Sequence, residues 1–370
     1  MKKLRILIQT DTYAMGGAEK YLMEVLPYLT DHGYEVNLIC RDFKVISELR
    51  NFFIGLNCPV LSLPKNFLSL TPVHIKKALK LLLSSDVVFI NKIYPTKSLL
   101  FIISGVLLRK KVVCFEHLPG PVASNNWLRS VILRFLIRLV MFNVECVLCS
   151  TVQCKEFCIS YYHYPSEKIK VIEHGIDLSR IGDLSIRNNN KLVRIALVGR
   201  LCEQKGQLSF IEMVDQLVNK VNEQNFEVEF WGDGELESRI KAQVLEKGLS
   251  RYIHLKGRSL NKNEIFEDKD FIVIPSVWEA QCYVLLEAAS FKIPAIAFDV
   301  GGIKNFITNG VNGVLISPYD KLEFVKAVHS FIRDRDLCKS MGILAYDKVV
   351  KDFSKEKMVN KLLTVFKEYE

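Results

Sequence analysis

Short apolar runs alternate along the chain with longer segments in which apolar residues recur every three or four positions. The short runs are apolar on both faces, which is typical of parallel strands covered by helices on each side. The longer segments have the period of amphipathic helices. The pattern predicts strands at residues 4–10, 34–40, 86–92, 111–117, 145–150 and 168–175 of the first half, and at residues 194–200, 227–234, 253–258, 271–276, 294–300 and 313–318 of the second.

This alternation of strand and helix, repeated in each half, predicts an α/β protein of two doubly wound, Rossmann-like domains that face each other across a cleft. We expect the first domain at residues 1–175 and the second at residues 192–351. The polar, asparagine-rich residues 176–191 predict a linker. A last helical segment, about residues 352–370, is expected to pack back on the first domain. Ligands of such sheets bind beyond the carboxyl ends of the strands, so candidate site residues are sought there.

Charge and composition narrow the function. The chain has 50 Lys and Arg against 41 Asp and Glu, a formal charge of +9 that favours anionic partners such as phosphorylated small molecules and anionic lipid. The basic residues are scattered and no nucleic-acid motif is visible, so no nucleic-acid partner is expected. The most apolar segment, residues 98–111, is shorter than the ~18–20 residues of a membrane span. The first residues do not have the apolar core of a signal peptide, and a cytoplasmic protein is expected.

Ten cysteines in a chain of this kind indicate thiols kept in a reducing compartment. Four lie close together in the sequence, at Cys146, Cys149, Cys154 and Cys158. The first two fall in a predicted strand, where an offset of three sends side chains to opposite faces. We therefore interpret these cysteines as small buried apolar residues rather than as metal ligands.

Two Asp-x-Asp pairs are also interpreted as unrelated to metal binding. A metal-dependent transferase of one domain would carry such a pair just after a strand. Asp268 and Asp270 instead precede the predicted strand at residues 271–276, and Asp334 and Asp336 follow a helical segment. Both pairs are expected to be solvated ends of elements, and no metal is expected at the functional site.

The first candidate phosphate contact is Gly16-Gly17, which follows the first strand and precedes an amphipathic helix that begins near Ala18. Glycine lets the backbone approach a ligand, and the amides of a first helical turn attract anions. An ordinary turn before a helix is the alternative. The spacing is not that of a nicotinamide site, which argues against a dehydrogenase.

In the second half, Arg200 ends a strand and Lys205 lies about one turn further on, with a glycine beside each. Two cations at the mouth of a parallel sheet suit a diphosphate, because Arg supplies a fixed fork of donors and Lys a mobile charge. Solvated surface charge is the alternative. Gly232 and Arg258 end the next two strands, where either could support a flat base.

The segment "WEAQCYVLLEA" follows a strand-like run and carries two acids, Glu279 in a loop and Glu287 in the helix that should begin near Gln281–Cys282. The backbone amides of Gln281, Cys282 and Tyr283 would lie between the acids. Carboxylates accept hydrogen bonds from vicinal hydroxyls, and a helix end takes a phosphate, so this order could hold a nucleotide sugar. Two solvated helical glutamates are the alternative.

Together, "GGAE", "VGRLCEQKG", "WGDGELE", "WEAQCYVLLEAA" and "FDVGGIKNFITNGVNGVLI" follow in the order and at the intervals of a known family. The chain resembles the retaining glycosyltransferases of family 4, of bacterial surface-polysaccharide type, which have the GT-B fold. The resemblance covers nearly the whole chain and is most specific between residues 194 and 318. In the first half it is carried by "GGAEKYLMEVLPYLTDHGYEV", "FEHLPG" and "KVIEHGID".

The resemblance implies transfer of a sugar, with retention, from a UDP- or GDP-sugar to a glycan or lipid-linked acceptor, as in lipopolysaccharide or capsule synthesis, without a cofactor. Arg200 and Lys205 would neutralise the departing diphosphate, and Gly16 and Gly17 would approach the donor phosphate and sugar. A non-hydrolysing nucleotide-sugar epimerase and a non-catalytic nucleotide-sugar-binding protein stay open as alternatives.

Further roles follow from the same resemblance. Glu279 would lie at the donor sugar hydroxyls and Glu287 at the ribose. His117 would lie near the reacting sugar, with general acid–base catalysis, positioning or oxocarbenium stabilisation as its role. His174 is interpreted as part of the hinge. Front-face substitution is implied as the mechanism, with Glu279 as covalent nucleophile the alternative.

The chain departs from the family pattern at two places. Ala280-Gln281-Cys282 replace the customary Gly-Phe-Gly after the first glutamate, so the donor sugar cannot be carried over from the family. Lys304-Asn305 replace the usual Pro-Glu pair after Gly301-Gly302, which leaves an acid missing.

Two cationic apolar segments, residues 74–83 and 127–142, have helical spacing with Lys or Arg among long aliphatic side chains. Such segments can lie on an anionic bilayer, or be core helices whose basic residues extend to water. Given the positive charge of the chain, we expect peripheral contact with the inner face of the cell membrane.

Overall fold

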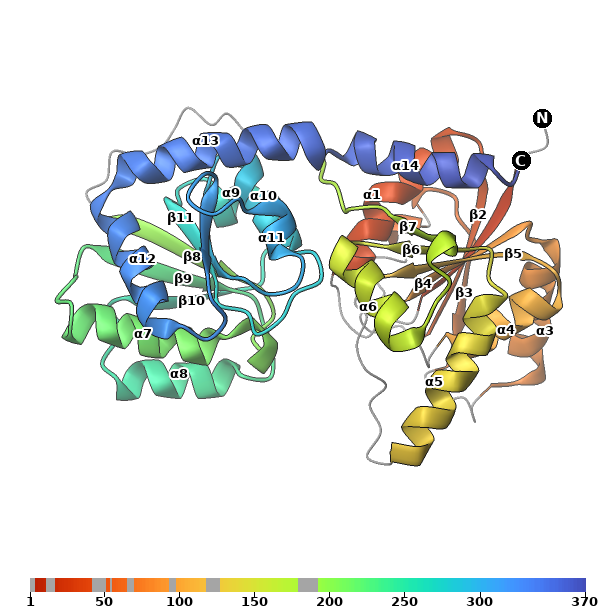
Figure 1. Ribbon diagram of the computed structural model, residues 1–370, viewed down its shortest axis with the longest axis horizontal. Coiled ribbons are helices and arrows are strands. Elements are labelled where there is room, and N and C mark those ends of the chain that lie inside the picture. Colours follow the sequence, from red (N-terminus) through yellow and green to blue (C-terminus); the bar gives the residue numbers. More distant parts are fainter. Residues whose placement is uncertain are drawn as a thin grey trace. The chain divides into compact units, whose positions relative to one another are not determined.

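The computed structural model of the protein describes residues 4–10, 17–41, 51–53, 55–64, 70–92, 98–117, 127–178 and 192–370 (Figure 1). The chain divides into two compact units. Unit 1 comprises Met1–His174 together with Lys355–Glu370, and unit 2 comprises Gly175–Ser354. Ile176, from the start of the predicted linker, forms a parallel bridge with Ser354 and so is paired within unit 2.

Unit 1 is built on a seven-stranded parallel sheet with the order β3-β2-β1-β4-β5-β6-β7. Six strands match predicted runs, whereas β3 was not predicted. It is a four-residue edge strand between Pro59 and Pro64 and is only partly buried, so its apolar signal is weak. The strands are β1 (Arg5–Thr10), β2 (Glu35–Arg41), β3 (Val60–Leu63), β4 (Val87–Lys92), β5 (Lys111–Glu116), β6 (Cys146–Cys149) and β7 (Ile169–Val171).

Helices cover both faces of this sheet (Figure 1). On one face, Tyr21 of α1 packs on Phe115 with ring centroids 4.4 Å apart, and Phe366 of α14 packs on Phe89 at 6.0 Å. On the other face, one apolar cluster joins alternate strand residues to the remaining helices. The helices are α1 (Gly17–Asp31) and α14 (Lys355–Lys367) on the first face, and α3 (Pro72–Ser84), α4 (Leu99–Leu107), α5 (Trp127–Phe142) and α6 (Val152–Tyr162) on the second.

Unit 2 has a six-stranded parallel sheet with the order β10-β9-β8-β11-β12-β13, and all six strands match predicted runs. The strands are β8 (Val193–Val198), β9 (Phe226–Trp231), β10 (Ile253–Gly257), β11 (Phe271–Ile274), β12 (Ala295–Phe298) and β13 (Gly313–Ile316). The helices are α7 (Gln207–Asn219), α8 (Glu237–Glu246), α9 (Lys262–Phe266), α10 (Tyr283–Ser290), α11 (Ile303–Phe306), α12 (Lys321–Arg333) and α13 (Arg335–Asp352).

The strand order of unit 2 reverses at its centre. From β8 the chain moves outward to β9 and β10, then returns to β11 on the opposite side of β8. The helices that follow these two strands, α7 after β8 and α10 after β11, lie on opposite faces of the sheet, which leaves a crevice at the carboxyl ends of the strands. The residues that follow these two strands are the ones to examine for a ligand site.

Candidate functional site

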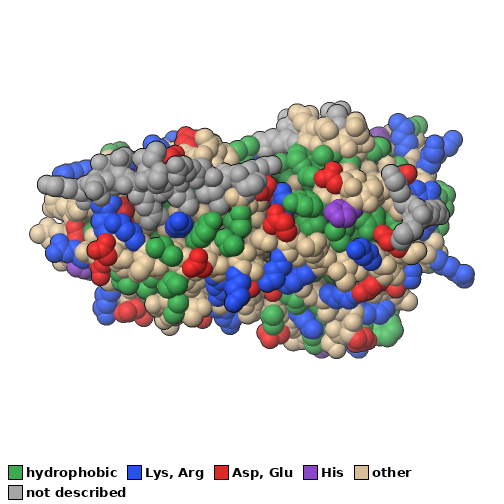
Figure 2. Space-filling view, turned by 90° about the horizontal axis from the view of Figure 1, so that it is seen from above, with side chains coloured by type: hydrophobic (Ala, Val, Ile, Leu, Met, Phe, Trp, Pro, Cys, Tyr) green, Lys and Arg blue, Asp and Glu red, His purple; other side chains and the backbone are tan. Residues whose placement is uncertain are grey.

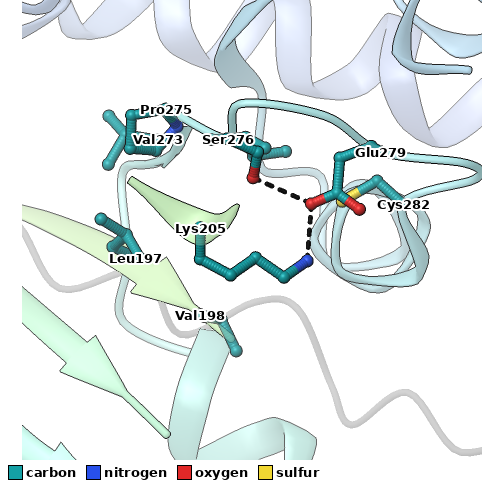
Figure 3. A pocket seen from close by; sticks show the side chains of 9 residues that line it. Leu197, Val198, Lys205, Val273, Pro275, Ser276, Glu279 and Cys282 are labelled. Atoms are coloured by element: carbon teal, nitrogen blue, oxygen red, sulfur yellow. Dashed lines mark hydrogen bonds and ion pairs between the residues drawn. The ribbon is translucent and has the colours of Figure 1, made fainter. Parts of the chain in front are cut away.

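An ion pair between a half-buried lysine and a buried glutamate lies where the loops after β8 and β11 meet. Lys205 ends the short 3-10 turn Glu203–Lys205, and its Nζ is 2.5 Å from Oε1 of Glu279. The Ser276 hydroxyl donates to the same Oε1 at 2.8 Å (Figure 3). Glu279 is only 8% exposed, so its carboxylate depends on these two partners. The pair lines a small pocket together with Leu197, Val198, Val273, Ile274, Pro275 and Cys282.

Two glycines allow this approach of the loops. Gly206 has φ +74°, and a Cβ there would lie 2.0 Å from the carbonyl oxygen of Pro275. Gly301 has φ +55°, and a Cβ there would lie 1.6 Å from the carbonyl oxygen of Glu279. Both positions need a left-handed backbone with no side chain. Gly206 thus brings the start of α7 against the end of β11, and Gly301 fixes the loop that carries Glu279.

The electrostatics follow from burial beside a carboxylate. Burial lowers the pKa of Lys205, but the adjacent Glu279 outweighs burial, so the pKa lies above its usual value. Lys205 is therefore charged at neutral pH. Burial, and then the Glu279 carboxylate, raises the pKa of Cys282 to about 12, which keeps this thiol neutral.

The second predicted acid, Glu287, lies in α10 and is 4% exposed. Its Oε1 is 3.6 Å from Nζ of Lys262. Helix α10 begins at Tyr283 with Cys282 as its N-cap, one to two residues later than the sequence predicts, and no side chain caps it. Gln281 is half-buried in the preceding loop. The two acids and the start of α10 are thus brought together as predicted, although their roles stay predictions.

The remaining predicted residues of unit 2 follow neighbouring strands. Arg200 follows β8 and is exposed, with no ion pair to other described residues. Gly232 follows β9, where a Cβ would lie 2.1 Å from the carbonyl oxygen of Gly199. Arg258 follows β10 at the sheet edge and is also exposed. Sequence reasoning did not single out Ser276, because a serine at the end of a strand gives no distinctive signal.

The Asp-x-Asp pairs are not merely solvated ends. Asp268 is ion-paired to Arg194 and to Lys269, and Asp270 accepts from Arg335 at 2.6 Å. These contacts fasten the loop before β11 to its surroundings. Asp334 caps α13 by accepting from the amide of Leu337 at 2.9 Å. The expectation of free surface carboxylates was therefore wrong for the first pair, because a sequence does not show which cations fold against it.

In unit 1, Gly16 lies outside the described residues, and Gly17 is the first residue of α1. His117 follows β5 and is 5% exposed. Its Nε2 is 2.5 Å from Oδ1 of Asn91, and its Nδ1 is 3.1 Å from Nε2 of His174. His174, which sequence reasoning interpreted only as hinge, is thus a direct partner of the predicted catalytic histidine.

This network assigns the protons of His117. The Asn91 amide donates to Oγ1 of Thr10 and to the carbonyl of Ala18, both at 3.3 Å, so its Oδ1 faces the ring. His117 must then donate from Nε2 and accept at Nδ1 from His174. Burial and then His174 lower the pKa of His117 well below its usual value, and burial lowers the pKa of His174 to about 3. Both imidazoles are neutral, and both nitrogens of His117 are engaged.

Comparison with known proteins adds to this geometry. The family profile for glycosyltransferase family 4 matches residues 15–180, and the profile for glycosyl transferases group 1 matches residues 185–348. The two profiles follow each other over nearly the whole chain. The chain belongs to glycosyltransferase family 4. The dehydrogenase interpretation is excluded by this match, and the epimerase and non-catalytic alternatives are not favoured by it.

Relatives of this glycosyltransferase include an enzyme of Escherichia coli named UDP-Gal:alpha-D-GlcNAc-diphosphoundecaprenol alpha-1,3-galactosyltransferase. It is 26% identical over 95% of this chain and 94% of its own length. The fold is shared with Anabaena HepE crystallised with UDP, at a TM-score of 0.82, 16% identity and coverage of 99% and 100%. A glycosyltransferase of Rickettsia africae has a TM-score of 0.81 at 19% identity, with coverage of 100% and 99%. The GT-B architecture predicted from the sequence is confirmed.

Proposed function

We propose that this glycosyltransferase takes a sugar from a nucleoside-diphosphate sugar held by unit 2, and that the Lys205–Glu279 pair is the centre of donor binding. The observation that carries the proposal is this ion pair between the loops after β8 and β11. These are the strands at which the order of the sheet reverses, where ligands of doubly wound sheets bind.

Lys205 would meet the diphosphate. An ammonium group has three N–H donors, and the described residues engage Lys205 at a single oxygen of Glu279. The remaining donors are available to phosphate oxygens. The exposed guanidinium of Arg200, which follows the same strand, would add a second positive charge. Positive charge fixed in place before the bond breaks stabilises the departing diphosphate more than the intact donor.

Glu279 would hold the sugar. Both hydrogen bonds to its side chain go to Oε1 (Figure 3). Oε2 therefore keeps its acceptor capacity for sugar hydroxyls, while Lys205 and Ser276 fix the orientation of the carboxylate. Glu287 would accept from the ribose, with the start of α10 between the two acids. Gly232 and Arg258 would border the base.

For the reaction itself we propose metal-independent transfer with retention by front-face substitution, in which the departing diphosphate helps to deprotonate the acceptor hydroxyl. Glu279 as a covalent nucleophile is the alternative. His117 would position the reacting sugar rather than move a proton, because Asn91 and His174 occupy both of its ring nitrogens. Gly17, which begins α1, would approach the donor phosphate and sugar.

The test of the donor site is Glu279→Gln. Turnover should be abolished because the neutral amide donates where sugar hydroxyls need an acceptor, while nucleoside diphosphate affinity should stay within a few-fold. Unchanged turnover would remove Glu279 from the site. The matched control is Glu246→Gln, an exposed acid of α8 that should leave both quantities unchanged.

A panel of nucleotide sugars identifies the donor and separates an enzyme from a binding protein. A ligand at ~100 times its Kd adds about 2.7 kcal/mol of stability, which thermal unfolding detects. A catalyst must also release the nucleoside diphosphate when an acceptor is present. Donor binding without such release would support a binding protein, and epimerised donor without acceptor would support the epimerase.

The acceptor is proposed to be a glycan on a lipid carrier, in surface-polysaccharide synthesis. The name of the Escherichia coli relative gives alpha-D-GlcNAc-diphosphoundecaprenol as the acceptor of that enzyme. Among the described residues no helix combines the length and apolar character needed to cross a bilayer. We propose separately that the carrier lipid is bound at the inner face of the cell membrane.

Helices α3 and α5 would supply this contact. Only Ile137 and Met141 of the described side chains of α5 are buried, whereas five large apolar ones are exposed: Ile132, Phe135, Leu136, Leu139 and Phe142. Helix α3 exposes Val73, Ile75, Leu79 and Leu83 beside the exposed Lys76, Lys77 and Lys80. Exposed apolar side chains with cations suit an anionic lipid surface. On the face drawn in Figure 2 basic, acidic and apolar side chains are interspersed, which gives no nucleic-acid stripe.

Flotation with anionic vesicles tests the membrane contact. Phe135→Asp should weaken binding ~10–100-fold, because burying a Phe contributes about 1.5–3 kcal/mol. The control is Leu245→Asp on α8 of unit 2, where Leu245 is 75% exposed and the same change should have no effect. Equal loss in both variants, or no binding by the native chain, contradicts the proposal.

A further inference from the structure

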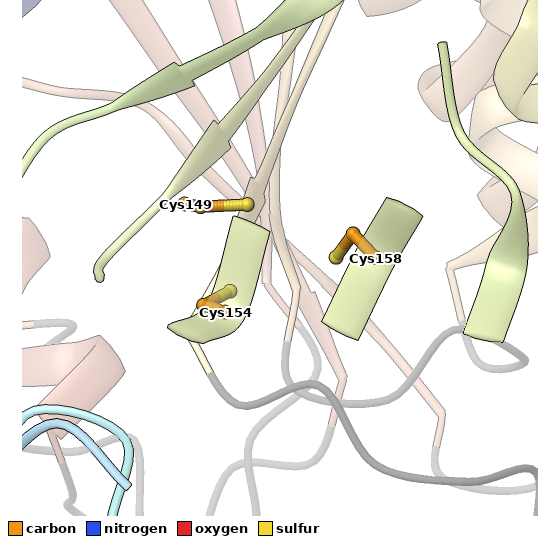
Figure 4. A group of neighbouring side chains, drawn as sticks. All are labelled: Cys149, Cys154 and Cys158. Atoms are coloured by element: carbon orange, nitrogen blue, oxygen red, sulfur yellow. The ribbon is translucent and has the colours of Figure 1, made fainter. Parts of the chain in front are cut away.

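Three cysteine side chains of unit 1 converge in its interior. The sulfur atoms of Cys149, Cys154 and Cys158 all lie within 4.8 Å of one another (Figure 4). Each residue is at most 3% exposed. Cys149 ends β6, and Cys154 and Cys158 lie four positions apart on α6, so both point from one face of the helix toward the strand.

Of the four neighbouring cysteines, strand alternation separates only Cys146 from the other three. Cys146 lies three positions before Cys149 on β6 and faces the other side of the sheet, where its thiol contacts Tyr369. The remaining three meet because α6 folds back over the face that Cys149 occupies. That packing cannot be read from the spacing of cysteines along the chain.

The cluster has the dimensions of a metal site. Tetrahedral zinc with Zn–S bonds of ≈ 2.3 Å sets sulfur atoms about 3.8 Å apart, so a shift of about 1 Å or less would close the group. A fourth ligand is at hand in the backbone. The carbonyl oxygen of Glu116 lies 3.2 Å from Sγ of Cys154, which donates to it, and accepts more weakly from the amide of Ser150 at 3.4 Å. When Cys154 loses its proton, the lone pair of the Glu116 carbonyl oxygen that accepted this hydrogen bond becomes available to a metal ion.

Charge selects the kind of ion. Three thiolates with a divalent ion carry −1, whereas a monovalent ion would leave −2 in a buried site, which costs more. A single negative charge matches the positive end of α6, because Cys154 lies in its first turn, where its amide donates to the cap Thr151 at 3.1 Å.

We propose that Cys149, Cys154 and Cys158 bind one divalent thiophilic cation of the zinc class. Binding forms three metal–sulfur bonds and releases the thiol protons to the solvent. The ion ties α6 to β6 and is structural. This site lies outside the proposed sugar-transfer reaction, so its test does not depend on catalysis.

The first experiment uses the reduced, full-length native chain without oxygen. Titration with Co(II) should give one equivalent of a complex with thiolate charge-transfer and tetrahedral d–d absorption, which Zn(II) then displaces. X-ray absorption of the Zn(II) complex should show three sulfur neighbours. No saturable complex, or fewer than three sulfur neighbours, overturns the proposal.

Variants assign the ligands. Cys149→Ser, Cys154→Ser and Cys158→Ser should each weaken Zn(II) binding by at least the ~10–100-fold that loss of a supporting group costs. Cys146→Ser on the opposite face and Cys114→Ser on β5 are matched controls that should bind as the native chain does. Native affinity in any of the first three overturns the assignment. Circular dichroism confirms that each variant is folded, and where one is not, the sulfur count of the native complex decides.

Discussion

The two units share a doubly wound parallel sheet but place opposite kinds of chemistry at their strand ends. Unit 2 carries the charged Lys205–Glu279 pair in its crevice, with the exposed Arg200 on the same loop. Unit 1 carries a chain of neutral groups, in which Asn91 and two uncharged imidazoles are buried against aromatic rings. Fixed charge suits a diphosphate, and neutral hydrogen-bonding groups suit a sugar or an uncharged acceptor.

The difference shows how burial acts on similar scaffolds. Lys205 is partly buried beside a carboxylate, so the ion pair outweighs the cost of burial and the lysine stays charged. His117 and His174 are buried beside each other, and His117 also contacts the neutral Asn91, so burial dominates and both imidazoles lose their charge. The charge state therefore follows from burial together with the charge of the neighbouring group.

The largest effect is expected from a variant that removes the positive charge of the Lys205–Glu279 pair. Lys205→Met should lower kcat ~10²–10³-fold, as does loss of one fixed group that stabilises a departing charge. It should also destabilise unit 2, because Glu279 is left buried without its cation. Steady-state kinetics and thermal unfolding measure the two effects.

The control and the double variant sharpen this result. Lys241→Met, in the exposed pair with Glu237, should change neither quantity appreciably. Adding Glu279→Gln to Lys205→Met should recover stability but not turnover. If turnover returns as well, the pair is structural and does not bind the donor.

The next effect belongs to the neutral network of unit 1. The pKa values of His117 and His174 are lower folded than unfolded, so the unfolded chain binds more protons below about pH 6.5. Above that pH, the two imidazoles make their full contribution to the free energy of unfolding. As pH falls below it, each imidazole should cost about 1.4 kcal/mol per pH unit, down to about pH 3 for His174.

Hydrogen exchange on the strands of each unit localises this loss, because it reports local opening. Amides of β4 and β5 should lose protection in acid before those of β8 and β11. His174→Gln should reduce the loss of stability per pH unit by the contribution of one imidazole. His32→Gln, at an exposed histidine of the same unit, should leave this loss unchanged. Equal acid sensitivity of the native chain and His174→Gln would show that the network does not govern the loss.

The smallest effect is expected at the helix caps, and we compare one cap in each unit. Thr71 accepts from the amide of His74 at 3.4 Å at the start of α3, and Asp320 accepts from the amide of Glu323 at 3.0 Å at the start of α12. Each change to Ala should cost ~0.5–2 kcal/mol. Asp320→Ala should cost more, because its bond is shorter and its charge favours the helix N-terminus. Hydrogen exchange within α3 and α12 measures the stability lost in each variant. A larger loss for Thr71→Ala than for Asp320→Ala would contradict the prediction.

The fold was largely predictable because buried parallel strands leave continuous apolar runs. All six strands of unit 2 and six strands of unit 1 match such runs, whereas the short, half-exposed edge strand β3 leaves only a weak one. For the proposed donor site, Arg200, Lys205, Glu279 and Glu287 were selected from their places at strand and helix ends, and their roles stay predictions. Ser276 and Asn91 were not selected, because a small polar residue after a strand is common and only its partner gives it meaning.

The sequence alone determined the class of fold, the family and the strand ends from which the site is built, because these depend on local periodicity and on motif order. Tertiary structure alone decided which groups meet. It joined Lys205 to Glu279, placed His174 on His117, and gathered three cysteines while turning Cys146 away. Such contacts depend on how separate elements pack. Neither the spacing of residues along the chain nor its composition gives the distance between side chains that are far apart in the sequence.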